Sequence, residues 1–183
     1  AAAHLSRIAA TPTQEAAALS LDWDYEHGDG EGSEGGGGTC TRLAVSELRG
    51  GIAVWQCEAA AAGATASGGS ATATLRALHR WQAHALCGEP IEVWITAFSR
   101  SNPQMIYSGA DDGVFKLWDI RLLRNDDGGE AGLAGAAPQR AALTSKDHGA
   151  GVCSLQCHPF REHVLATGSY DEIVRVWDER ALG

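Results

Sequence analysis

The feature that most constrains the fold of this chain is a passage that occurs twice. The stretches "YSGADDGVFKLWDIR" (107–121) and "LATGSYDEIVRVWDER" (165–180) share one order: a hydroxyl residue and Gly, an acidic turn, an apolar strand and Trp-Asp-x-Arg. A looser copy surrounds Trp55, so that three tryptophans recur about sixty residues apart. A short repeat cannot bury its hydrophobic face alone, and neighbouring repeats must stack to form a core. The sequence therefore predicts a stack of similar units.

Each copy is predicted to be a small antiparallel sheet. Its segments are short, are rich in β-branched and aromatic residues, lie between Gly, Asp and Asn turn signals, and show no helical period. The chain is therefore expected to be all-β. The expected first strands cover 17–23, 92–99 and 152–158, the second strands 42–48, 105–111 and 163–169, the third strands 51–56, 114–119 and 173–178, and the fourth strands 74–81 and 140–145.

Polar residues recur at fixed distances from two of the tryptophans. An Asp lies six residues before each, a Ser or Thr lies ten residues before, and a His precedes the first strand. In this pattern the copies resemble WD40 repeats, the four-stranded blades of a β-propeller. The resemblance implies buried hydrogen bonds from Asp to His, from His to the hydroxyl, and from the indole N–H to that hydroxyl. The expected sets are His84, Ser108, Asp112 and Trp118, and His148, Thr167, Asp171 and Trp177.

The residue types of the first set are also those of a hydrolase triad. Asp112, His84 and Ser108 could in principle act as orienting carboxylate, general base and nucleophile. The repeat spacing, however, places the hydroxyl in an interior strand, and the chain has no G-x-S-x-G elbow that would present a serine to solvent. We therefore interpret these residues as structural.

We expect a partial WD40-type β-propeller, with about three blades of a ring for which seven are expected. The expected units are 15–82, 83–146 and 147–183, the last truncated at its C-terminus. The first is degenerate, because Arg49 and Val45 occupy the positions of the Asp and the hydroxyl residue. Segments 27–38, 59–73 and 124–139 are rich in Gly and Ala and are expected to be flexible loops. The chain lacks an initiator Met, which suggests part of a longer product.

The composition limits the classes of partner and the cellular compartment that are expected for this protein. The net charge is −9 without a cluster of Lys and Arg, so nucleic acid and membranes are not expected partners. Five cysteines without a secretory signal favour reduced thiols in a cytosolic or nuclear protein, and we expect a cytoplasmic one. Cys153, Cys157 and His158 could form half of a metal site, but no second pair at ligand spacing completes it. We expect neither a metal nor another cofactor.

Two longer passages resemble one WD40 family, the diphthine methyl ester hydrolases of diphthamide biosynthesis. The resemblance covers 74–180 well and 15–57 loosely, and "LCGEPI" lengthens the loop after His84. The matching residues are Trp81, Ala83, His84, Glu92, Trp94 and Phe98 in the first passage, and Pro159, Arg161, Glu162, His163 and 165–172 in the second.

The resemblance implies hydrolysis of the methyl ester of diphthine on elongation factor 2. Such chemistry needs a water molecule activated by a general base and a place for the oxyanion. Outside the tetrads the candidate bases are His163 and Glu92, our leading pair, and His158, while Tyr170 could donate a hydrogen bond. Each could also be an ordinary exposed loop residue. Elongation factor 2 carrying methylated diphthine is the expected partner, and other proteins could bind the propeller face.

A non-enzymatic role is the alternative. Trp-Asp-x-Arg resembles the box through which WD40 substrate receptors bind cullin-4 ubiquitin ligase adaptors. Arg121 and Arg180 would then be exposed contacts, since arginine is favoured at interface hot spots. Alternatively, both arginines simply end a strand and face water, and the chain could also be an inactive scaffold.

Overall fold

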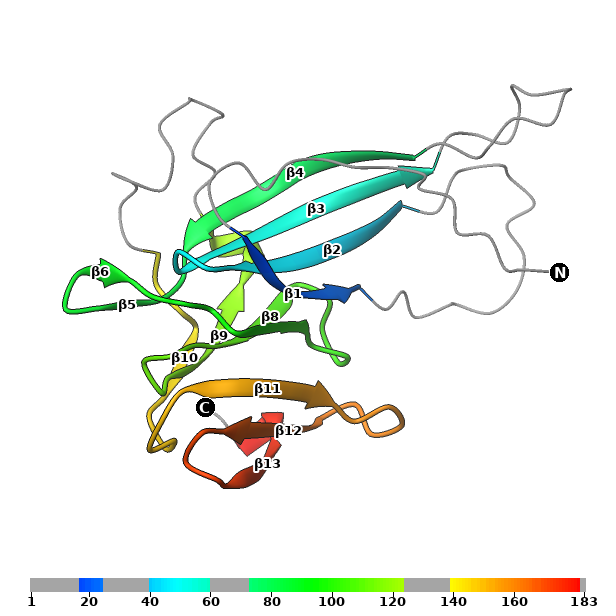
Figure 1. Ribbon diagram of the computed structural model, residues 1–183. Coiled ribbons are helices and arrows are strands. Elements are labelled where there is room, and N and C mark those ends of the chain that lie inside the picture. The colour runs from blue at the N-terminus through cyan, green and yellow to red at the C-terminus, as the bar shows by residue number, and fades with distance from the viewer. Residues whose placement is uncertain (1–16, 25–39, 60–72, 124–138, 182–183) are drawn as a thin grey trace, which may run out of the picture.

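The computed structural model describes residues 17–24, 40–59, 73–123 and 139–181, and the three Gly- and Ala-rich segments lie almost wholly outside these ranges. The described chain is all-β, which confirms the expected fold class. Its strands form three larger sheets and one small hairpin (Figure 1). The sheets contain β1 (Ala18–Trp23), β2 (Cys40–Glu47), β3 (Gly51–Ala59) and β4 (Ala73–Gln82); β7 (Ile95–Phe98), β8 (Met105–Gly109), β9 (Phe115–Asp119) and β10 (Leu143–Ser145); and β11 (Val152–Cys157), β12 (Val164–Ser169) and β13 (Val174–Asp178).

Every sheet follows the same antiparallel order, with each strand bonded to the next one in the chain. Within the described ranges the third sheet has three strands, and β13 forms its edge. A one-turn 3₁₀ helix follows the third strand in two sheets: η1 (Ile120–Leu122) after β9 and η2 (Glu179–Ala181) after β13. These two helices, which the sequence pattern did not predict, place the residue after each Trp-Asp pair between neighbouring sheets.

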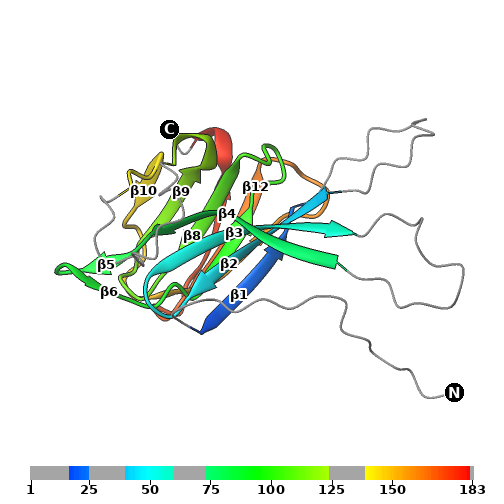
Figure 2. The same ribbon diagram turned by 90° about the horizontal axis from the view of Figure 1, so that it is seen from above.

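The first strands β1, β7 and β11 lie side by side, since β7 contacts both of the others, and β1 and β11 run in the same direction in Figure 1. Figure 2 views the stacked sheets from above, with the first sheet nearest the viewer. Near the beginning of β11, Val152 N–H donates to the carbonyl of Ala110, just after β8, at 2.9 Å. Near its end, the thiol of Cys157 donates to the carbonyl of Phe98, the last residue of β7, at 3.3 Å. Phe98 N–H in turn donates to Asp22 Oδ2 of β1 at 2.8 Å.

This parallel arrangement gives the stack two distinct ends. We call the end where the first strands begin the turn face, since it carries the tight turns between second and third strands. The other end, where the first strands finish, is the loop face; it carries the loops 99–104 and 158–163 and both 3₁₀ helices. In Figure 1 the turn face is on the left and the loop face on the right.

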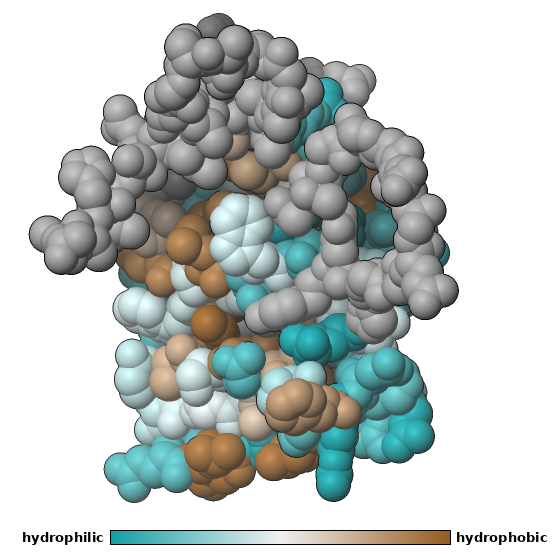
Figure 3. Space-filling view, turned by 90° about the vertical axis from the view of Figure 1, so that its right-hand side faces the viewer, coloured by the Kyte–Doolittle hydropathy of each residue, from teal (hydrophilic) through white to brown (hydrophobic). Residues whose placement is uncertain are grey.

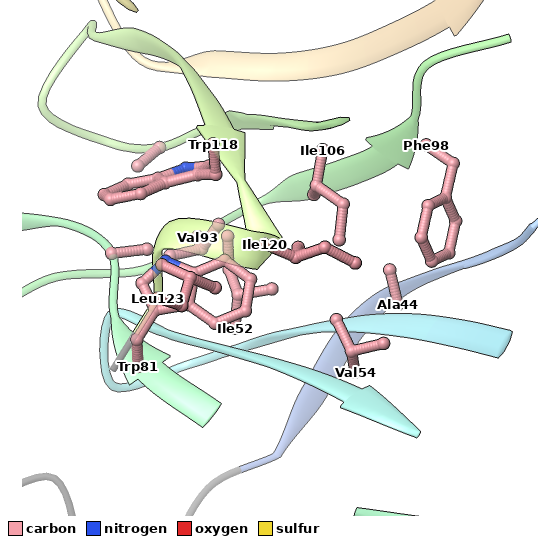
Figure 4. Close-up of a cluster of buried hydrophobic side chains, with 12 residues drawn as sticks. Ala44, Ile52, Val54, Trp81, Val93, Phe98, Ile106, Trp118, Ile120 and Leu123 are labelled. Atoms are coloured by element: carbon pink, nitrogen blue, oxygen red, sulfur yellow. The ribbon is translucent and has the colours of Figure 1, made fainter. Parts of the chain in front are cut away.

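Two apolar layers hold the sheets together. The layer between the first and second sheets includes an edge-to-face pair of Trp81 and Trp118, with ring centroids 5.7 Å apart, which lies at one end of the cluster drawn in Figure 4. The layer between the second and third sheets contains Phe115, which stacks on Tyr107 and on Trp177. Burying a large apolar side chain stabilises the folded state by about 1.5–3 kcal/mol, so these layers contribute most of the free energy that holds neighbouring sheets together.

One position recurs in all three turns on the turn face. Gly50, Gly113 and Glu172 each have a positive φ, of 75°, 70° and 65°. At Gly50 a Cβ atom would lie 2.3 Å from the carbonyl oxygen of His84, in the corner that leads to the next sheet. Glycine is therefore required where a neighbouring corner packs on the turn, whereas the exposed Glu172 has a left-handed backbone without that requirement.

The lengthened loop after His84 forms a hairpin of β5 (Ala85–Leu86) and β6 (Glu89–Pro90). Cys87 and Gly88, at its tip, have consecutive positive φ values of 53° and 88°, as in a tight two-residue turn. The extra residues are thus accommodated outside the sheets. Among the described residues, no helix has the length and apolar character needed to cross a bilayer.

Candidate functional site

The polar tetrad of the second sheet is a continuous chain of hydrogen bonds. His84 Nδ1 lies 3.0 Å from Asp112 Oδ2, and His84 Nε2 lies 2.8 Å from Ser108 Oγ. The indole N–H of Trp118 donates to the same Oγ at 2.9 Å. His84 comes from the corner after β4, Ser108 from β8, Asp112 from the following turn and Trp118 from β9. The tetrad therefore ties one corner to three parts of its sheet.

Burial and partners fix the protons of this tetrad. Burial lowers the pKa of His84, and the neighbouring Asp112 only partly offsets this effect. Burial opposes ionisation of Asp112, but hydrogen bonds from His84 and from Val114 N–H lower its pKa. A neutral His84 therefore donates a hydrogen bond from Nδ1–H to the carboxylate and accepts a hydrogen bond from the Ser108 hydroxyl at Nε2. Because Ser108 is fully buried, its hydroxyl cannot reach a substrate.

The third sheet departs from the expected pattern. Thr167 Oγ1 lies 3.1 Å from His148 Nε2 and accepts from the Trp177 indole at 2.7 Å. The direct bond expected between Asp171 and His148 is absent, because their nearest atoms are 4.0 Å apart. Arg175 lies between them, with Nη1 2.9 Å from His148 Nδ1 and 2.8 Å from Asp171 Oδ2.

The reason for this correction is the length and charge of one side chain. Arg175 occupies the position of Lys116 in the second sheet, and Lys116 Nζ donates to the carbonyl of Ala83 at 2.8 Å. A guanidinium is donor-only, so His148 Nδ1 must accept, which leaves its Nε2–H to donate to Thr167. The two tetrads therefore hold opposite histidine tautomers.

A second polar cluster, which we call the Glu179 cluster, lies on the loop face between the second and third sheets. Glu179 accepts hydrogen bonds from the hydroxyls of Ser99, at 2.7 Å, and of Ser101 and Tyr107. His163 Nδ1 lies 3.3 Å from Glu179 Oε2. Only 10% of the Glu179 side chain is exposed, against 42% of His163. The cluster thus joins a buried carboxylate to a histidine that solvent can reach.

The electrostatics of the cluster keep the carboxylate ionised. Burial alone would favour a neutral Glu179, but its side-chain donors outweigh burial and lower the pKa of the carboxyl group. Burial, with Glu179 beside it, raises the pKa of Tyr107. The same causes raise the pKa of the Cys157 thiol to about 12, so that this thiol stays protonated.

The structure separates the leading pair of candidate bases. His163 is on the loop face, whereas Glu92 precedes β7 on the turn face, where its carbonyl accepts from Asp111 N–H at 3.0 Å. The first strands lie between them, so they cannot act on one reacting group. His158 shares the loop face with His163, but its Nδ1 accepts from Phe160 N–H at 3.0 Å. Of the three candidates, His163 alone combines the loop face with a carboxylate partner.

The candidate partner-binding residues lie on both faces. Tyr170 is 60% exposed beside the β12–β13 turn. Arg121 and Arg180 are exposed on the loop face, and each makes a two-pronged ion pair with the Asp of its own Trp-Asp-x-Arg. In both forks the Nη2–Oδ2 distance is 2.6 Å. These bidentate ion pairs fix the direction of each arginine side chain. Contact of either arginine with a partner protein remains a prediction.

A hollow of about 130 Å³ lies between the first strands of the three sheets. Its lining includes Asp22, Thr96, Arg100, Gln156 and Cys157. Both Arg100 and Glu179 act electrostatically on the Cys157 thiol, so the hollow and the Glu179 cluster are neighbours. Figure 3 looks onto the loop face, where hydrophilic groups adjoin apolar ones over the third sheet at the bottom.

Sequence reasoning did not find Glu179, Ser99, Ser101 or Tyr107. One signal was present: Glu179 is the variable residue of the second Trp-Asp-x-Arg, where the first has Ile120. Ile120 is buried in the apolar layer between the first and second sheets. A charged residue at a position that is apolar in the sister repeat marks a place where the fold alone does not explain the choice.

Comparison with known proteins accounts for the repeats. The model of the WD domain, G-beta repeat, matches residues 76–119 and 141–178. These two stretches are WD40 repeats. The structure also resembles a chain in the crystal structure of the Mitotic Checkpoint Complex, with a TM-score of 0.52 and 18% identity, over 90% of this chain and 36% of that one. At this identity the likeness shows a shared fold only.

The family resemblance stated from the sequence is confirmed. The chain is 42% identical over 108 residues to human diphthine methyltransferase, covering 59% of the chain and 20% of the relative. It is 39% identical over 103 residues to the diphthine methyltransferase homolog of Dictyostelium discoideum, covering 56% and 25%. The chain thus spans about a fifth to a quarter of the length of these relatives.

Proposed function

We propose that this protein acts in diphthamide biosynthesis, where it hydrolyses the methyl ester of diphthine on elongation factor 2 in the cytoplasm. The observation that carries the proposal is the 42% identity to human diphthine methyltransferase, whose name gives diphthine as the substrate and a methyl group as the moiety concerned. The loop face supplies the chemistry, since it presents an accessible histidine bonded to an ionised carboxylate.

His163 is the general base of the proposed reaction. Its Nε2 takes a proton from water while the water oxygen bonds to the ester carbonyl carbon. The resulting tetrahedral oxyanion collapses, the bond to the methoxy oxygen breaks, and the proton on His163 is returned to methanol as it leaves. A well-placed base of this kind contributes about 10²–10⁴-fold in rate. The products are diphthine and methanol, and no cofactor is consumed.

The surroundings of His163 support this role. Loops held by a rigid frame commonly carry catalytic groups, and His163 lies in the β11–β12 loop at the border between two sheets. Arg100 lines the neighbouring hollow, where a guanidinium can stabilise the oxyanion. A residue modified on another protein can reach this open face, whereas the buried tetrads are closed to it.

The decisive experiment incubates the protein with elongation factor 2 that carries methylated diphthine, in water enriched in heavy oxygen. Hydrolysis at the carbonyl removes a methyl group and places heavy oxygen in the new carboxylate, which peptide mass spectrometry detects. Methyl transfer to diphthine would instead add mass without incorporating heavy oxygen. That outcome, or an unchanged peptide, would contradict the proposal.

Two histidine variants locate the base. We expect His163→Ala to lose about 10²–10⁴-fold in demethylation rate, because Nε2 is the proton acceptor. His158→Ala is the matched control, since it removes an imidazole from the same loop whose Nδ1 is already bonded to the backbone. Loss of activity in the control alone would move the base to His158, and full activity in both would remove this site from the reaction.

A further inference from the structure

We infer that Glu179 is the positioning residue of His163, holding the imidazole with its proton on Nδ1 so that Nε2 is the free basic nitrogen. Four contacts of one carboxylate carry this inference. Three hydroxyls, from Ser99, Ser101 and Tyr107, donate to Glu179, and His163 Nδ1 completes the set at 3.3 Å. The expected effect of Glu179 on the rate of ester hydrolysis rests on the proposed function. The position of the proton on the His163 ring does not.

The proton assignment follows from the donor inventory. An ionised carboxylate has no proton to give, so every group within hydrogen-bond distance of it must donate. His163 Nδ1 is such a group and therefore carries a hydrogen. A neutral imidazole has one N–H and one lone pair, which leaves the lone pair on Nε2. Because 42% of the His163 side chain is exposed, that nitrogen is open to water.

The backbone fixes the same two residues in register. Glu179 N–H donates to the carbonyl of His163 at 2.8 Å, where η2 begins beside the loop that precedes β12. The two side chains thus extend from backbones that are bonded to each other. This double connection restricts the ring as well as its proton, as a carboxylate does for the base of a Ser-His-Asp triad.

Stability alone does not account for a charge at this position. The sister repeat has Ile120 there, fully packed in the apolar layer between sheets. A buried carboxylate costs desolvation energy, and well-packed apolar residues are often as stabilising as a buried polar cluster. Three hydroxyl donors offset the cost at Glu179 without supplying a counter-charge. The arrangement instead keeps a negative charge beside the one histidine that faces solvent in this cluster.

The test compares the parent with Glu179→Gln by nitrogen NMR of the histidine rings, with His163→Ala identifying the His163 signals. We expect the parent to show a protonated Nδ1 and an unprotonated Nε2 in its neutral ring. In Glu179→Gln the amide can also donate, so the ring should change toward the tautomer with the proton on Nε2. Glu172→Gln, an exposed change on the turn face, removes the same charge and should leave the His163 signals unchanged.

Enzyme kinetics of the Glu179 variants provide a second test of the positioning role. If ester hydrolysis is established, Glu179→Gln should lower kcat about 10²-fold or more with KM nearly unchanged, since the substrate does not touch Glu179. Glu179→Asp, which keeps the charge but withdraws it by one methylene, should retain the tautomer and part of the rate. Should Glu179→Gln fail to fold, Glu179→Asp decides through both measurements.

The outcomes separate the two proposals. An inactive parent with the expected tautomer would refute ester hydrolysis and leave the positioning role intact. A His163 ring that keeps Nδ1 protonated in Glu179→Gln, or a parent ring protonated on Nε2, would overturn the positioning role whatever the activity. A Glu179→Gln variant that loses kcat with an unchanged tautomer would also overturn it, because the loss would then have another cause.

Discussion

The second and third sheets each carry a His, a hydroxyl residue, an Asp and a Trp in the same places, yet their histidines hold their protons on opposite nitrogens. In the second sheet Asp112 accepts directly from His84. In the third sheet Arg175 stands between Asp171 and His148 and donates to both. A motif therefore fixes which side chains meet, whereas a neighbour outside the motif fixes where the proton resides.

The comparison also separates two ways of burying a histidine. His84 is neutral and bonded to an anion, whose own charge is compensated by further donors. His148 is neutral because burial and the adjacent guanidinium both lower its pKa. The first arrangement depends on one carboxylate, and the second on a guanidinium that bridges a carboxylate and a ring. Variants that remove or exchange these partners should affect the sheets unequally.

The largest expected effect is that of Asp112→Ala. It leaves the buried Nδ1–H of His84 without an acceptor and should cost about 1–3 kcal/mol of unfolding free energy in urea titrations. Asp171→Ala is the sister variant. It should cost less, because Arg175 still donates to His148. An equal or greater loss for Asp171→Ala would break the distinction between the two sheets.

Acid should destabilise the protein through both histidines. Burial depresses the pKa of His84 and of His148 in the folded state. The stability they contribute is therefore complete above the unfolded pKa, near 6.5, and is lost as the pH falls below it. The slope due to His84 approaches about 1.4 kcal/mol per pH unit. Unfolding followed between pH 7 and pH 5 measures it, and a His84→Asn variant should have a shallower slope.

Exchange of one cation should convert the third tetrad into the second. Arg175→Lys would place an ammonium where Lys116 stands in the sister sheet, within reach of a backbone carbonyl. Asp171 would then bond directly to His148, and nitrogen NMR should show the His148 proton on Nδ1. The change in stability should be under about 1 kcal/mol, as one charged partner replaces another. A His148 proton that stays on Nε2 would show that Arg175 does not set it.

The smallest effect is expected at the turns. Glu172 has the left-handed backbone that Gly50 and Gly113 have in the sister sheets. Glu172→Gly removes the strain on an L residue, about 1 kcal/mol, but it adds freedom to the unfolded chain. The net change should be a stabilisation of about 0.5 kcal/mol or less by thermal unfolding. A clear loss of stability would mean that the Glu172 side chain holds the turn.

Much of the fold could be predicted because the same spacing of residues recurs in successive repeats. The strands that contain Trp118 and Trp177, and the hydroxyl residues ten positions earlier, follow from spacing within each copy. The tetrad of the second sheet depends only on such spacing. The bridge through Arg175 does not, since a strand residue of the right length can replace a bond that the motif implies.

The loop face was harder to predict because it is assembled from separate repeats. Glu179 meets Ser101 only when two sheets are stacked and both loops are placed. The separation of Glu92 from His163, in contrast, was available from the sequence, because Glu92 begins an expected first strand and His163 begins an expected second strand. Strand direction alone puts such residues at opposite ends of the sheet.

The β5–β6 hairpin has a practical consequence for labelling. Its tip residue Cys87 is an exposed free thiol, and the pairing of Ala85 with Pro90 closes the hairpin before the sheet begins. A maleimide dye attached there would project from the turn face. Cys157, buried and with its pKa raised to about 12, would react far more slowly at neutral pH. The hairpin therefore offers a place for a fluorophore that reports on events at one end of the molecule.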